Sequence, residues 1–273
     1  MAEEDVPRLG QLHPSRRSDK EGRSEFVLEA ADLSAHCRLR DAQSVRCTSD
    51  VALLGDRHEI LDLGEAHGGG TPSQLGYKGF PASVCTSRNH VVCNGIPRAD
   101  EVLRPGDIIN IDVTSGLGGF HGDTSATFII GDASEEARHV VDVARRCRDA
   151  GIATIRDGAR LGDIGAAVAE LAERLGCSVV RDYGGHGIGR QMHMEPHVPH
   201  FGRRGSGLRL RAGMALTVEP MINLGAPEVR TLDDGWTVVT ADGRLSAQFE
   251  HTVLVTREGV EILTSAPYER TST

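Results

Sequence analysis

The sequence lacks the features that would place the protein in a membrane or on nucleic acid. No apolar run approaches the length of a membrane-spanning helix, and the acidic start MAEEDVPRLG does not resemble a signal peptide. The net charge of −9 leaves no basic excess for direct binding to nucleic acid. We therefore expect a cytoplasmic protein without a membrane or nucleic-acid partner.

Paired cysteines are also missing. The six cysteines include no Cys-x-x-Cys pair, which disfavours zinc-ribbon and thioredoxin-like folds. In a cytosolic chain of 273 residues we expect free thiols rather than a disulfide framework. Cys85 and Cys93 flank a loop and could line a pocket, whereas the other four are at least as typical of small buried side chains.

The composition divides the chain into three parts. Residues 1–70 form an atypical N-terminal segment rich in Arg, Ser and Asp, with candidate short helices within 25–33 and 51–70. Residues 71–265 carry the clear structural signals, and residues 266–273 form a C-terminal tail. We find no low-complexity linker and no internal repeat.

The signals after residue 70 predict an α+β fold. Residues rich in Ile, Val, Thr and Phe predict strands at 108–114 and 124–130. Asp132 and Glu135 resemble a capping box that begins a helix, and a second helix from Leu161 ends near Gly176. More strand-like stretches follow, at 177–183, 214–222, 235–241 and 245–256. Strands, two helices and further strands fit neither a βαβ alternation nor an all-β pattern.

Five polar residues stand in or beside apolar strand-like stretches, where such residues are uncommon: Asp112, Asp123, His186, Glu219 and Glu250. Each alone is typical of a turn, a solvated edge or a loop. Together, four carboxylates in one core would repel one another unless cations held them. Oxygen-rich sites with one imidazole suit Mn²⁺, Fe²⁺, Co²⁺ or Zn²⁺, and bridging carboxylates can hold two ions roughly 3.5–4 Å apart.

Five motifs in order and spacing resemble the type I methionine aminopeptidases: NIDVT, FHGDTSATF, GHGIGR, LTVEPM and SAQFEHT. The resemblance covers about residues 71–256. It implies the pita-bread fold, in which two pseudo-symmetric α+β halves surround a dinuclear metal site. It also implies removal of the initiator methionine from nascent proteins when the second residue is small.

The resemblance implies a role for each matching residue. Asp112 would chelate one ion, Asp123 and Glu250 would bridge both, and His186 and Glu219 would complete the second. The two divalent ions would be Co, Mn, Fe, Zn or Ni. Glu219 would also serve as the general base.

Other matching residues would bind the substrate. His193 would contact it and steady the tetrahedral intermediate. A pocket for the methionine side chain would be lined by Tyr77, Phe80, Cys85 and Trp236, since aromatic and sulfur groups suit a thioether.

Two departures from the family pattern stand out. The stretch NHVVCNGIP carries Asn94 where the family has a histidine that contacts the substrate and aids turnover. Asn94 can exchange hydrogen bonds but cannot change charge near neutral pH. His90, four residues earlier, could compensate only if the loop places it inward. Residues 10–70 lack the regular helix and the Lys-Pro-Gly turn that the family shows there.

The leading hypothesis is therefore a monomeric dimetal aminopeptidase that acts on nascent N-termini at the ribosome. A non-catalytic or weakly active pita-bread module that binds peptides or the ribosome is the alternative, which Asn94 keeps open. A proline-directed peptidase of the same fold is the third, although such enzymes carry a long extra N-terminal domain. Retention of all five candidate ligands favours the enzyme.

Overall fold

The computed structural model describes residues 70–264. The expected helices within 25–33 and 51–70 and the tail at 266–273 lie outside the described residues. The proposed division of the chain at residues 70 and 265 stays a prediction.

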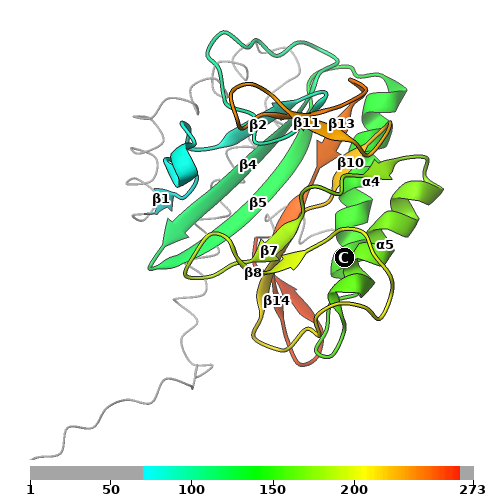
Figure 1. Ribbon diagram of the computed structural model, residues 1–273. Coiled ribbons are helices and arrows are strands. Elements are labelled where there is room, and N and C mark those ends of the chain that lie inside the picture. Colours follow the sequence, from blue (N-terminus) through cyan, green and yellow to red (C-terminus); the bar gives the residue numbers. More distant parts are fainter. Residues whose placement is uncertain (1–69, 265–273) are drawn as a thin grey trace, which may run out of the picture.

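A long β-hairpin dominates the described fold (Figure 1). Strands β4 (Ile108–Leu117) and β5 (Phe120–Ile129) pair antiparallel over their whole length. Gly118 and Gly119 join them with φ angles of 58° and 79°, a conformation that suits a tight hairpin turn and disfavours other residues. The two predicted strands are confirmed, and both extend further toward this turn than the composition indicated.

The hairpin belongs to a nine-stranded sheet with the order β1-β4-β5-β14-β9-β7-β8, in which β2 also pairs with β4 and β15 with β14. Each of these pairings is antiparallel. The remaining strands of this sheet are β1 (Thr71–Pro72), β2 (Cys85–Arg88), β7 (Gly185–Gly187), β8 (Met194–Val198), β9 (Ala215–Val218), β14 (Glu250–Val255) and β15 (Val260–Ile262). The short 3₁₀ turn η1 (Tyr77–Gly79) lies between β1 and β2.

Two of the predicted strands each divide into two. The stretch 214–222 forms β9 and then β10 (Met221–Asn223), and 245–256 forms β13 (Ser246–Gln248) and then β14. In both cases the chain passes from one sheet to another. Pro220 marks the first break because it has no N–H for the ladder. Glu219 and Glu250 stand at these two crossings.

The described residues form two smaller sheets of three strands each. One has the order β13-β10-β6, with β6 at Ser178–Val179. The other has the order β11-β12-β3, with β3 at Val91–Cys93, β11 at Val229–Thr231 and β12 at Val238–Thr240.

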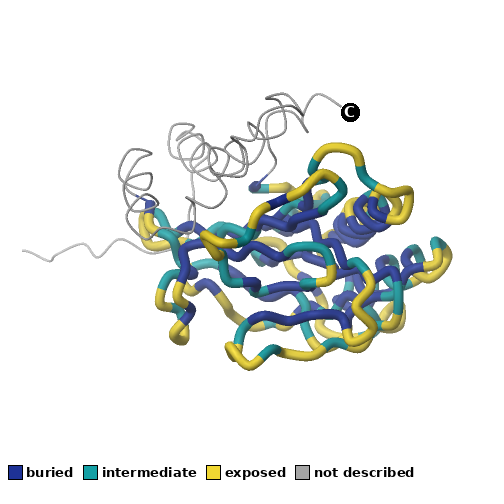
Figure 2. The backbone as a smooth tube through the Cα atoms, turned by 90° about the horizontal axis from the view of Figure 1, so that it is seen from above, coloured by how far each residue is buried: buried dark blue, intermediate teal, exposed yellow. Residues whose placement is uncertain are grey.

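The two α-helices of the described residues lie side by side over the β13-β10-β6 sheet (Figure 1). Helix α4 spans Glu135–Ile152 and helix α5 spans Leu161–Arg174. Their buried faces meet that sheet in a core that includes Val140, Val168 and Ile222. Figure 2 shows buried residues running through the strands and exposed residues gathered at the turns. The α+β expectation is confirmed.

The expected start of α4 is wrong by two residues. The N-cap is Ser134, whose side chain accepts a hydrogen bond from the Ala137 N–H at 3.1 Å. Asp132 is exposed and lies 3.9 Å from Arg138. Serine and aspartate are almost equally good N-caps, so the local sequence alone did not distinguish them. The end of α5 is as expected: Gly176 follows the last turn with a φ of 74°.

Replacing Ser134 with alanine should lower the free energy of unfolding by about 1 kcal/mol, because an N–H of the first turn loses its acceptor. Asp132→Ala is the matched control and should change it little, since exposed ion pairs contribute little. Urea unfolding of both variants is the measurement. A larger loss for Asp132→Ala would show that the capping box begins the helix after all.

Candidate functional site

The sheet register places carboxylates on one face of the sheet. Residues directly opposite one another on paired strands point to the same face. Asp112 on β4 faces Cys85 on β2 and Ser125 on β5, and Ser125 in turn faces Glu250 on β14. The register of β14 with β9, continued by one residue, brings Glu219 beside Glu250. One row across the sheet thus carries three of the five predicted ligands, with the predicted pocket residue Cys85 at its end.

A second row runs two residues further along the same strands. Thr114 on β4 faces Asp123 on β5. The Thr252 hydroxyl donates to the Asp123 carbonyl at 2.8 Å, and Thr252 faces Thr217 on β9. The His186 N–H donates to the Thr217 hydroxyl at 2.9 Å. Because side chains alternate along a strand, both rows share one face, and the five predicted polar residues converge there.

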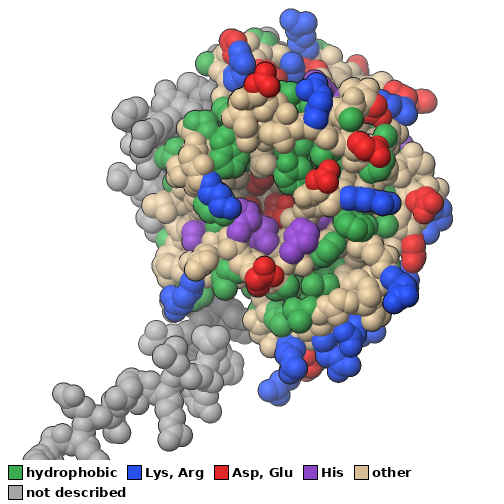
Figure 3. Space-filling view, in the orientation of Figure 1, with side chains coloured by type: hydrophobic (Ala, Val, Ile, Leu, Met, Phe, Trp, Pro, Cys, Tyr) green, Lys and Arg blue, Asp and Glu red, His purple; other side chains and the backbone are tan. Residues whose placement is uncertain are grey.

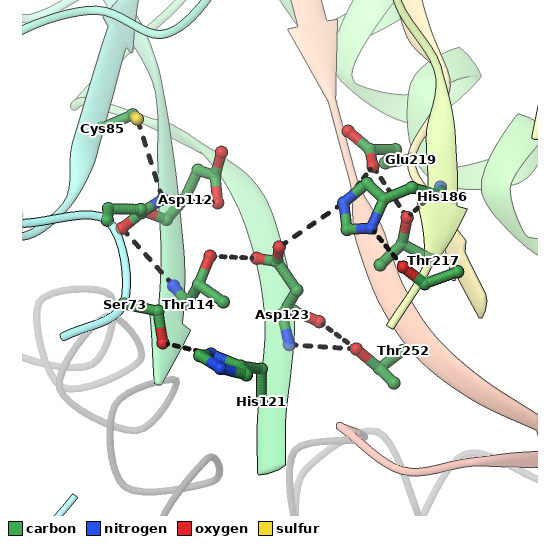
Figure 4. Close-up of polar contacts among 12 residues, drawn as sticks. Ser73, Cys85, Asp112, Thr114, His121, Asp123, His186, Thr217, Glu219 and Thr252 are labelled. Atoms are coloured by element: carbon green, nitrogen blue, oxygen red, sulfur yellow. Dashed lines mark hydrogen bonds and ion pairs between the residues drawn. The ribbon is translucent and has the colours of Figure 1, made fainter. Parts of the chain in front are cut away.

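The side chains of Asp123, His186 and Glu250 form a compact group. Each presents a ligand atom within 4.8 Å of the others, and all three are buried. His186 Nε2 lies 3.8 Å from Asp123 Oδ2 and 3.5 Å from Glu219 Oε1. Figure 4 shows Asp123 directed toward His186, with Asp112 on the β2 side of the group. This cluster of oxygens around one imidazole fits a divalent metal ion.

The negative charges of the clustered carboxylates favour binding of a cation. Burial raises the pKa of Asp112, Glu219 and Glu250 well above their usual ranges, and repulsion by the neighbouring carboxylates, Asp123 first among them, raises it further. Burial also raises the pKa of Asp123, against the opposing effect of His186. Glu250 Oε1 is buried without a hydrogen-bond partner among the described residues. A bound cation would satisfy that oxygen and neutralise the repulsion.

Neutral side chains hold the carboxylates in place. The Thr114 hydroxyl donates to Asp123 Oδ1 at 2.8 Å, and the Thr217 hydroxyl donates to Glu219 Oε1 at 2.8 Å. Gln248 Nε2 donates to Glu219 Oε2 at 3.1 Å. His186 Nδ1 lies 3.0 Å from the Gly187 carbonyl, which leaves Nε2 facing the acids.

Sequence reasoning missed these partners, although a signal for three of them exists. Thr114, Thr217 and Gln248 each stand two positions from a predicted ligand. In a continuous strand, as the sequence predicted at these positions, period-two alternation would put each of them on the ligand's face.

His200 supports the crossing at Glu219. Its Nε2 accepts a hydrogen bond from the Glu219 N–H at 3.1 Å, at the residue where the chain leaves β9. Burial lowers the pKa of His200 to about 3, so the ring stays neutral and remains an acceptor at physiological pH. Sequence reasoning did not single out this residue.

The cluster opens into a cavity of about 680 Å³. Its walls include all five predicted ligands and all six predicted catalytic or pocket residues outside that set: Tyr77, Phe80, Cys85, Asn94, His193 and Trp236. Phe80 and Trp236 meet edge to face, with ring centroids 5.1 Å apart. Burial raises the pKa of the Cys85 thiol well above its usual range, so the sulfur stays neutral. Figure 3 shows the hollow, with acidic side chains inside it and histidines around it.

His193 stands between the cluster and the pocket. Its ring centroid lies 4.2 Å from that of His186 and 5.0 Å from that of Tyr77. Desolvation, followed by the neighbouring His186, Lys78 and His121, lowers the pKa of His193 to about 4. The ring is therefore neutral near pH 7 and offers one N–H donor.

The structure separates Asn94 from His90. Asn94 lines the cavity with a φ of 55°, a left-handed conformation that asparagine tolerates well. His90 is exposed in the turn between β2 and β3 and does not line the cavity. The inward placement that compensation by His90 required is absent.

The chain matches known proteins over most of its length. The model of metallopeptidase family M24 matches residues 28–257. Methionine aminopeptidase A of Synechocystis sp. is 54% identical over 240 residues, or 88% of this chain and 94% of that protein. Methionine aminopeptidase B of that organism is 60% identical over 191 residues, 70% of each chain. A crystal structure of methionine aminopeptidase from Rickettsia prowazekii shares 42% identity and a TM-score of 0.77, over 90% of this chain and 96% of that one.

Neither helix within residues 70–264 has the length and the hydrophobicity that crossing a bilayer requires.

Removing divalent ions with a chelator should destabilise the protein more at about pH 7.5 than at about pH 5.5. The raised carboxyl pKa values mean that the metal-free folded state binds more protons than the unfolded chain. Its stability is therefore highest below the unfolded pKa values and falls as pH rises toward the folded ones. Metal ions replace those protons. The measurement is the difference between the melting temperatures with and without Co²⁺ across this pH range.

Glu250→Gln is the matched variant for this measurement. It removes one buried negative charge, so the metal-free variant should melt at a higher temperature than the metal-free wild type near pH 7.5. Co²⁺ should raise its melting temperature far less than that of the wild type. If the melting-temperature difference of the wild type with and without Co²⁺ does not change with pH, the electrostatic explanation is wrong.

Proposed function

The chain belongs to metallopeptidase family M24, and on this premise we propose that it is an aminopeptidase that removes the initiator methionine from new proteins. Its α+β architecture is the expected pita-bread fold of its relatives. The observation that carries the proposal is the buried Asp123, His186 and Glu250 cluster, which lines a cavity with aromatic and sulfur walls. The names of the two curated relatives, both methionine aminopeptidases, support the choice of substrate.

We propose that the five clustered side chains hold two divalent ions of Co, Mn, Fe, Zn or Ni. Asp112 would serve one ion, His186 and Glu219 the other, and Asp123 and Glu250 both. The raised carboxyl pKa values and the unpartnered Glu250 oxygen support this assignment. When bound, such ions polarise the scissile carbonyl and make water a nucleophile at neutral pH.

The chain's own groups would bind the substrate and move the proton. The methionine side chain would enter between Phe80, Cys85 and Trp236, whose polarizable surfaces suit a thioether. Glu219 would take a proton from the attacking water and pass it to the leaving amine. Thr217 and Gln248 hold its two oxygens for this task.

The neutral His193 would donate its N–H to the substrate oxygen that becomes negative. Asn94, on the same cavity wall, would be a second and neutral hydrogen-bonding partner of the substrate. Because Asn94 cannot change charge near neutral pH, we expect turnover below that of relatives with histidine there.

The proposed substrates are nascent N-termini at the ribosome, and we propose a monomeric enzyme in the cytoplasm. The charge of −9 argues that any ribosome contact does not depend on an overall basic surface. The non-catalytic alternative is the weaker hypothesis, because the full set of candidate ligands converges and the relatives are named as enzymes.

The enzyme should cleave Met-Ala-Ser peptides far faster than Met-Arg-Ser peptides. The resemblance implies a snug methionine pocket with little space beyond the scissile bond, so a long second side chain would clash. A series of peptides varied at the second position, assayed with Co²⁺ or Mn²⁺, is the test. Asp123→Ala, prepared in the same way, controls for contaminating peptidases and should be inactive. Equal rates for Ala and Arg would contradict the proposed specificity.

Replacing Asn94 with histidine should raise kcat by up to about 100-fold, since the donor it restores acts mainly in the transition state. Metal content should not change, because Asn94 is outside the ligand set. Histidine also tolerates the left-handed backbone at this position.

Two control variants accompany Asn94→His. Asn94→Gly fits the same backbone without a side chain and should lower kcat, which shows what the asparagine itself contributes. His90→Ala alters the exposed turn and should leave kcat unchanged. A strong loss in His90→Ala together with no gain in Asn94→His would mean that the loop moves His90 inward during turnover.

A further inference from the structure

The edge of the main sheet has a gap beside Asp112. Strand β1 pairs with β4 at Gly116 and Ser115, while β2 pairs with β4 from Asp112 back to Ile109. Between these pairings, the Thr114 carbonyl accepts from the Ser73 N–H at 2.8 Å just past β1, but the Thr114 N–H has no backbone partner on either edge strand. After β1 the chain turns away toward η1, and Gln74 stands at this point.

The side chain of Gln74 fills the gap in the way that a strand would. Its Oε1 accepts a hydrogen bond from the Thr114 N–H at 3.4 Å, and its Nε2 donates to the Asp112 carbonyl at 3.2 Å. The amide therefore completes the backbone ladder of β4 beyond Ser73, at the Thr114 N–H and the Asp112 carbonyl. Because the Thr114 N–H can only donate, it fixes which end of the amide is the oxygen.

The same amide reaches the cluster. Gln74 Nε2 also donates to Asp112 Oδ1 at 3.2 Å and lies 3.7 Å from the Cys85 sulfur. Gln74 is only 7% exposed and lines the cavity, so water does not readily replace these bonds. It is the neutral donor to the Asp112 carboxylate among residues 70–264, just as Thr114 serves Asp123 and Thr217 serves Glu219.

We propose that Gln74 is a positioning residue for the metal centre, which orients the Asp112 carboxylate toward the ion that Asp112 serves. The proposal rests on the proposed function, in which Asp112 is a ligand. A carboxylate on a strand can rotate about its own side-chain bonds, and a fixed donor on one oxygen leaves the other directed at the ion. Partners of this kind commonly change metal affinity by about 10- to 100-fold.

A purely structural role is the competing explanation, because the Gln74 amide also closes the sheet edge. Ser73 separates the two explanations. Its hydroxyl lies 2.8 Å from His121 Nδ1, so it ties the same loop to β5 without touching a candidate ligand. Loss of the Ser73 bond should loosen the loop but leave Asp112 oriented.

Calorimetric titration of chelator-treated protein with Co²⁺ is the test. In Gln74→Met, which keeps the volume but removes the donor, one of the two Co²⁺ ions should bind about 10- to 100-fold more weakly, while the other binds as in the wild type. Ser73→Ala should bind both ions as the wild type does. Equal losses in the two variants, or unchanged affinities in Gln74→Met, would overturn the proposal.

If Gln74→Met fails to fold, Gln74→Ser takes its place. The smaller side chain leaves room for water to pair with the β4 backbone, so the sheet edge survives while the fixed donor is lost. The same weakening of one ion is expected, and wild-type affinity for both ions would again overturn the proposal. A wild-type protein that takes up no Co²⁺ would instead refute the proposed metal site itself. Normal uptake by the wild type with unchanged Gln74 variants refutes only the role of Gln74.

Discussion

Repulsion among four carboxylates on one buried face is the constraint on which the rest of the site depends. Asp112, Asp123, Glu219 and Glu250 cannot all be ionised there unless positive charge lies between them. The fold therefore leaves two choices, protons or cations, and at neutral pH cations are the better partners. The neutral donors around the acids follow from this. Thr114, Thr217, Gln248 and Gln74 hold single oxygens in place without cancelling the charge that attracts the ions.

The antiparallel sheet is what makes such a cluster possible. Each strand contributes residues two apart, so a ligand and its supporting hydroxyl share a face by backbone geometry alone. The crossings at Glu219 and Glu250 place two of the acids where a strand leaves one sheet for another. His200 satisfies the backbone N–H that the crossing at Glu219 frees, and it stays neutral because it is buried. The two crossings between sheets therefore also fix the positions of two of the candidate ligands.

The two sides of the cavity differ in their chemistry. The pocket side, with Phe80, Cys85 and Trp236, is apolar and neutral and can only recognise shape and polarizability. The opposite side carries the acids and His186. His193 lies between them as a neutral donor. Asn94 lies in the cavity wall at the position where the type I methionine aminopeptidases that the sequence resembles have a histidine. In this chain, the groups at positions 94 and 193 are therefore both neutral hydrogen-bonding groups.

The sequence by itself determined what depends on local patterns and motifs. Composition and periodicity identified the two hairpin strands, both helices and the α+β class. The family resemblance identified the candidate ligands and pocket residues, all of which line the cavity. Only the tertiary structure decided the rest. The exposure of His90 and the bonds of Gln74 to Asp112 and Thr114 depend on which distant segments meet. The choice of Ser134 over Asp132 as N-cap is local, but the sequence offered two nearly equal caps and only the structure showed which one is used. Asp123 and Thr252 share hydrogen bonds across 129 residues of chain. A single sequence records neither that pairing nor its register, because a shift by one residue would turn every side chain of the shifted strand to the opposite face while leaving each local pattern unchanged.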